Sequence, residues 1–103
     1  EEFKMRTALV GALLLAFAPL AALAQDAVTG RNLAASCAMC HGTDGRAVGG
    51  NEPLAGMAKD ELVRKVKEFR SGAKPATIMH QISKGYTDQQ IDLIAAFFAA
   101  QKK

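Results

Sequence analysis

The chain is poor in the residues from which many functional sites are built. It has no tryptophan, one tyrosine, two cysteines and two histidines among 103 residues. A structural zinc site needs four ligands, and beyond the segment Cys37–His41 the chain offers only His80. The 13 basic and 10 acidic residues include no long basic run. These absences argue against a zinc domain and against nucleic-acid binding.

The N-terminal part, residues 1–24, is predicted to be a secretory signal peptide preceded by a few extra residues. Lys4 and Arg6 stand before the apolar run Ala8–Ala24, which ends in the small-x-small cleavage signal Ala-Leu-Ala. The alternative is an uncleaved membrane anchor, because this run reaches the lower limit of a bilayer span. We expect cleavage and a periplasmic location, with no membrane contact for the remaining domain, residues 25–103. A domain of that size gains little stability from an apolar core alone.

The most informative stretch is Cys37–His41, in which two cysteines stand two residues apart and histidine follows at once. This is the pattern of covalent c-type haem attachment. The two thiols add to the porphyrin vinyl groups, and the adjacent imidazole ligates iron. A thioredoxin-like disulfide shares the cysteine spacing but needs a βαβ pattern, which is not visible here. We therefore predict that Cys37 and Cys40 anchor one haem c and that His41 is its proximal ligand.

Hydrophobic periodicity predicts an all-α domain. Thr29 is a candidate N-cap for a short first helix that the haem motif terminates. Residues 59–71 carry one apolar stripe, and Gly72 stands in the stop position. Thr87 and Gln90 form a capping box for a last helix, which we expect to cross the first one. Its predicted inward face consists of Ile91, Ile94, Ala95 and Phe98.

The glycine-rich stretch 42–56 is predicted to be a loop beside the haem. A proximal histidine normally donates its second ring N–H to a nearby carbonyl. The carbonyl of Pro53 is the candidate acceptor, although Pro53 could equally serve only to shape a turn. Leu54 is then a predicted haem contact.

The ligand on the other face of the iron is less certain from the residues alone. Met57, Met79 and His80 are the candidates by side-chain type. Met79 follows the loop at Pro75 and is the leading candidate. Its lead is small, because a methionine is more often core filler. Bis-histidine ligation through His80 is chemically sound, so the choice stays open on these grounds.

Five segments taken in order resemble the class I cytochromes c, most closely the haem subunit of flavocytochrome c sulfide dehydrogenase and related single-haem cytochrome c domains. They are residues 37–45, 53–56, 69–72, 76–91 and 95–99. The resemblance implies an all-α fold of three main helices and short ones around one covalently bound haem. It also implies thioether roles for Cys37 and Cys40, His41 as proximal ligand, Pro53 as its carbonyl partner and Met79 as distal ligand.

With both axial positions filled, such a protein is expected to be an electron carrier and not an enzyme. Its partners would be redox proteins. The alternative is the haem subunit of a sulfide-oxidising complex, with a flavoprotein as partner. A ligand-binding or peroxidatic haem protein is a third reading, which requires an open position on the iron.

Overall fold

The computed structural model describes residues 2–103; Glu1 and the side chains of residue 3 and residues 7–18 lie outside the described part. The main helices are α1 (Glu2–Ala34), α3 (Lys59–Ser71) and α5 (Asp88–Ala99), with the one-turn helices α2 (Ala38–His41) and α4 (Met79–Ile82) between them. Short 3-10 turns occupy Ala35–Cys37, Thr43–Gly45 and Ser83–Gly85. Residues 2–103 contain no strand, so the predicted all-α class is confirmed.

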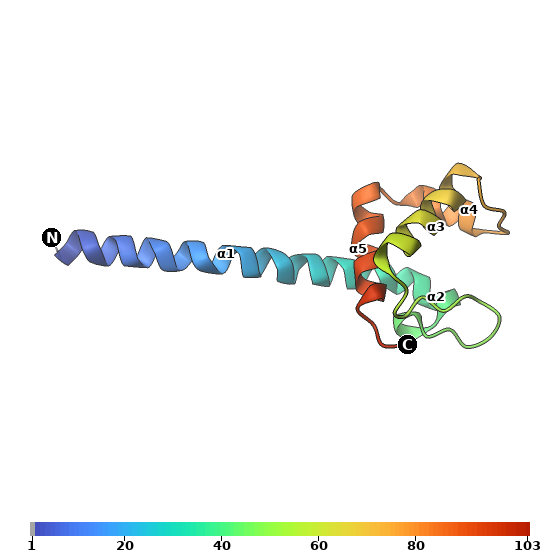
Figure 1. Ribbon diagram of the computed structural model, residues 1–103, viewed down its shortest axis with the longest axis horizontal. Coiled ribbons are helices and arrows are strands. Elements are labelled where there is room, and N and C mark those ends of the chain that lie inside the picture. The colour runs from blue at the N-terminus through green and yellow to red at the C-terminus, as the bar shows by residue number, and fades with distance from the viewer. Residues whose placement is uncertain (1) are drawn as a thin grey trace.

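The first helix is much longer than the sequence pattern suggested. Figure 1 shows α1 extending from the N-terminus into the rest of the molecule, with its last turns against α5. Thr29 is therefore not an N-cap: its hydroxyl donates to the carbonyl of Gln25 at 2.9 Å inside the helix. A threonine inside a helix can bond back to the carbonyl four residues earlier, and the alanine-rich stretch before Thr29 favours helix.

The expected signal peptide falls largely on residues 7–18, whose side chains lie outside the described part. Within the described residues, no helix has the length and apolarity that a membrane span requires.

The first and last helices, α1 and α5, cross as predicted. Gly30 lets them do so at close range. A Cβ atom at Gly30 would stand 2.7 Å from the backbone oxygen of Leu93, so only glycine fits without displacement. The pairing of α1 with α5 is the most extensive between helices in the described residues. This crossing fixes the end of α1, and with it the position of the motif that follows.

The core lies where α1, α3 and α5 meet (Figure 1). Its buried members are Ala34, Leu62, Ile94, Ala95 and Phe98. The predicted bounds of α3, its left-handed stop at Gly72 and the Thr87–Gln90 capping box are all confirmed. The predicted inward face of α5 is buried, including Ile91, so periodicity located the core correctly.

Candidate functional site

The motif Cys37–His41 lies directly after α1, in a 3-10 turn that passes into α2. Gly42 ends this helix with φ of +83°, and a Cβ there would stand 2.2 Å from the Arg46 oxygen. Cys37 is half-buried and Cys40 exposed, and the two do not form a disulfide. Burial raises the pKa of the Cys37 thiol above its ordinary value. The two thiols thus project from one helical turn as unpaired groups.

The imidazole of His41 is held by a backbone carbonyl. Its Nδ1 lies 2.6 Å from the carbonyl oxygen of Glu52. A carbonyl can only accept, so Nδ1 carries the proton, and in the neutral ring Nε2 then keeps a free lone pair. The prediction that Pro53 supplies this carbonyl is wrong by one residue. The acceptor is the carbonyl of Glu52, the residue directly before Pro53, and a residue in that position is restricted to extended conformations.

Glu52 lies in a segment that is fixed at almost every residue. The side-chain amide of Asn51 donates to the Cys40 carbonyl at 2.8 Å. The Lys65 ammonium of α3 pairs with the Glu52 carboxylate, which raises the pKa of Lys65. The N–H groups of Leu54 and Ala55 both donate to the Gly45 carbonyl, at 2.8 and 3.1 Å. The carbonyl that receives His41 is therefore part of a well-anchored loop.

Met79 begins α4, across the molecule from the glycine-rich loop. It is half-buried, and its carbonyl accepts a 2.6 Å hydrogen bond from the buried hydroxyl of Ser83. His80 is also half-buried, and its Nδ1 is enclosed with no hydrogen-bond partner among the described residues. Met57 packs instead against the apolar core, as does Leu54. Met79 and His80 thus share one helical turn, while Met57 is accounted for by packing.

Several contacts around the motif carry no signal in the sequence. Nothing in the spacing points to Asn51, Glu52 or Lys65 as partners of the motif. The Tyr86 hydroxyl lies 2.7 Å from that of Ser36, which ties the turn before Cys37 to the segment before α5. These pairs are separated by ten or more residues, and only the folded chain brings them together.

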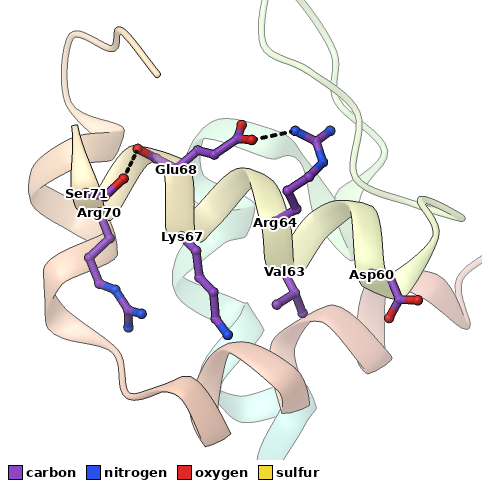
Figure 2. A pocket seen from close by; sticks show the side chains of 7 residues that line it. All are labelled: Asp60, Val63, Arg64, Lys67, Glu68, Arg70 and Ser71. Carbon is purple, nitrogen blue, oxygen red and sulfur yellow. Dashed lines mark hydrogen bonds and ion pairs between the residues drawn. The ribbon is translucent and has the colours of Figure 1, made fainter. Parts of the chain in front are cut away.

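A hollow on α3 stands apart from these groups. Its lining consists of Asp60, Val63, Arg64, Lys67, Glu68, Arg70 and Ser71. Figure 2 shows Arg64 paired with Glu68 on one side of the helix, while Val63, Lys67 and Arg70 point to the other. None of the predicted site residues belongs to this lining, so the hollow is not the predicted site.

The residues of the motif fit a covalently attached haem. Two unpaired thiols on one turn match the two thioether bonds, and the free Nε2 of His41 matches an iron ligand. Apolar side chains flank Met79 at the surface: Ile78 is 57% exposed and Ile82 39% exposed. An apolar macrocycle would find both a donor set and apolar contact surface here.

A family model described as cytochrome c matches residues 27–102 of the chain. The chain is 35% identical over 74 residues to the cytochrome subunit of sulfide dehydrogenase from Chlorobaculum tepidum, covering 72% of this chain and 67% of that protein. It is 37% identical over 100 residues to cytochrome c4 of Pseudomonas aeruginosa, covering 95% of this chain and 50% of that protein.

A third relative is the thiosulfate dehydrogenase electron acceptor of Stutzerimonas stutzeri. Identity to it is 40% over 96 residues, which cover 88% of this chain and 44% of the relative. The chain thus spans two thirds of the first of these relatives and half or less of the other two. Because the family model covers most of the chain, including the Cys-x-x-Cys-His motif, the chain belongs to the cytochrome c family and binds covalently attached haem c.

Proposed function

We propose that this chain is a periplasmic one-electron carrier whose single haem c is anchored by Cys37 and Cys40 and ligated by His41 and Met79. The observation that carries the proposal is the contact between His41 Nδ1 and the Glu52 carbonyl. It fixes the ring orientation and the tautomer, which leaves Nε2 available as a ligand. Residues 1–24 act in this proposal as the export signal, with residues 25–103 as the working domain.

Three observations favour Met79 as the second ligand. Met57 is half-buried and packs against the apolar core, the commoner role of a methionine, whereas Met79 and His80 are the candidates on α4. The Nδ1 of His80 is buried with no acceptor to orient the ring, whereas ligating histidines almost always have such a partner. The Ser83 hydroxyl anchors the turn that Met79 begins. Leu54 and Pro53 line the proximal loop and would contact the haem.

When bound, haem with histidine and methionine ligands exchanges single electrons at a comparatively high potential. In this proposal His41 and Met79 would supply both iron ligands, so no substrate would need to reach the metal, and we infer a carrier and not an enzyme. Its partners would be redox proteins. The relative that is an electron acceptor of thiosulfate dehydrogenase supports this reading.

A second candidate is the haem subunit of a sulfide-oxidising complex. The relative that is the cytochrome subunit of sulfide dehydrogenase favours it. In that case a flavoprotein would be the electron donor. Copurification of a flavin-containing protein with the exported chain would distinguish this assembly from a free carrier.

The test is an optical spectrum of the exported protein, ferric and ferrous, with and without carbon monoxide. We expect haem that resists acid-acetone extraction, a methionine-sulfur charge-transfer band in the ferric form and no response to carbon monoxide. Met79→Ala should abolish the band and open the iron to carbon monoxide, whereas His80→Ala and Met57→Ala should keep the band.

The opposite pattern would overturn the assignment. If His80→Ala opens the iron and Met79→Ala does not, His80 is the distal ligand. Rapid carbon monoxide binding by the unaltered protein would mean an open iron, and the electron-carrier function would fail.

A further inference from the structure

We propose that Lys65 is a positioning residue for the proximal histidine. Through its ion pair with Glu52, Lys65 fixes the carbonyl that accepts the His41 N–H, and in this way it lowers the reduction potential of the protein. The inference rests on the proposed ligation by His41. It adds a residue of α3, outside the haem motif and the glycine-rich loop, to the machinery that sets the potential.

Glu52 carries two contacts of different kinds in one residue. Its backbone oxygen accepts from His41 Nδ1, and its carboxylate pairs with Lys65. Any displacement of residue 52 therefore changes the hydrogen bond to the imidazole. The neighbouring tether, from the Asn51 amide to the Cys40 carbonyl, holds the loop at the motif itself. Lys65 supplies the corresponding tether to the helical core.

Lys65 is better fixed than an ordinary surface lysine. Its side chain is only 17% exposed, against 57% for that of the neighbouring Arg64. It also contacts the Glu61 carboxylate at 3.4 Å, one turn earlier on α3. Leu62 anchors this part of α3 in the core, where it is 3% exposed. The ammonium is thus held between two carboxylates on a helix that is packed in the core.

A firm carbonyl partner changes the imidazole as a ligand. The hydrogen bond makes the imidazole a stronger electron donor, and a stronger donor stabilises the ferric state. Weakening this hydrogen bond should therefore raise the potential. Removing a nearby positive charge should by itself lower the potential, because the loss of that charge favours the more positive ferric state by simple electrostatics. The two explanations predict shifts of opposite sign.

The experiment compares Lys65→Met with Arg64→Met in the exported holoprotein. Both variants remove one positive charge from adjacent positions of α3, but Arg64 pairs with Glu68 on the same helix and not with the loop. We expect the midpoint potential of Lys65→Met to shift upward and that of Arg64→Met to shift slightly downward. The His41 Nδ1 proton, followed by NMR in the ferrous protein, should exchange faster with solvent only in Lys65→Met.

Two further variants separate positioning from charge. The double variant Lys65→Met with Glu52→Gln leaves the net charge unchanged but removes the tether, so its potential should also rise. Lys65→Arg restores the pair and should return both readouts toward those of the unaltered protein. If Lys65→Met does not accumulate as holoprotein, Lys65→Gln is measured in its place with the same expected shifts.

A downward shift in Lys65→Met, or an unchanged potential in the double variant, overturns the inference. Unchanged exchange of the His41 proton does so as well. These outcomes differ from failure of the proposed function, because that failure is already visible in the unaltered protein as a missing methionine band or a response to carbon monoxide.

Discussion

Two regions of this small domain are held together in different ways. The crossing of α1 and α5, covered by α3, is an apolar core in which Ala95 and Phe98 are almost completely buried. Most of the loop from Gly42 to Gly56 is exposed or half-buried, although Ala55 is buried and Leu54 packs against the core. It is held mainly by hydrogen bonds to backbone carbonyls and by the pair of Lys65 with Glu52.

The difference matches the tasks of the two regions. Burial of apolar area is a non-directional source of stability, whereas hydrogen bonds depend steeply on distance and angle. The loop must place one carbonyl against His41, and directional contacts do this. Phe98 joins the two regions, since its carbonyl accepts from Gly56 and its ring lies against Gly45.

The largest expected effect comes from the residue that serves both regions. Phe98→Ala should destabilise the holoprotein by about 3–5 kcal/mol, as for other large-to-small changes of a buried aromatic residue. Denaturant unfolding followed by circular dichroism measures it. Phe97→Ala, at a half-buried neighbour, is the control, and it should lower the free energy of unfolding by a smaller amount. Equal losses for both would mean that the core does not centre on Phe98.

A glycine series tests the loop, with intermediate effects. Gly45 has φ of +80°, and a Cβ there would stand 2.7 Å from Ala55 N and 2.8 Å from the Phe98 ring. Gly45→Ala should therefore cost about 1–3 kcal/mol from backbone strain, and the steric clash adds to this loss. Gly49 also has a positive φ, but a Cβ there would have no neighbour within 4 Å. Gly50 has neither a positive φ nor such a neighbour.

The expected order of destabilisation is Gly45→Ala, then Gly49→Ala, then Gly50→Ala, in the same unfolding assay. If Gly45→Ala and Gly49→Ala cost the same, close packing of the loop on Phe98 contributes nothing and the two regions are independent.

The smallest expected effect is electrostatic and depends on pH. The Arg70 guanidinium, 2.6 Å from the Asp88 carboxylate, together with Lys67 holds the pKa of Asp88 below its ordinary value of 3.8. A lowered folded-state pKa stabilises the protein above the unfolded-state value, and this contribution is lost as the pH falls through the folded-state value. Asp88→Asn should lower the melting temperature slightly at pH 7.

That difference should shrink as the pH is lowered from 3.8, because the carboxylate of the unaltered protein then becomes protonated. Asp92→Asn is the control on the same helix, since Asp92 has no ion pair within the described residues. A difference for Asp88→Asn that persists unchanged at low pH would mean that its ion pairs do not contribute.

Much of the helical framework could be predicted because its signals are local. The apolar stripe and the glycine stop gave the bounds of α3, and the capping box gave the start of α5. The start of the first helix was predicted wrongly, because Thr29 can cap a helix or bond back within one, and the choice depends on the residues before it.

The sequence by itself determined the cofactor chemistry of this protein, since thioether attachment requires two thiols and an imidazole at one fixed spacing. Only the tertiary structure decided how the imidazole is held. Spacing left Pro53 as a candidate acceptor that could equally shape a turn, and the family resemblance favoured it. The contact falls instead on the carbonyl of Glu52, whose carboxylate pairs with Lys65. Local propensity specifies helices and caps, because its signals lie within a few residues. The partner of the His41 ring lies eleven residues away along a loop, so it depends on which carbonyl the folded chain turns toward that ring.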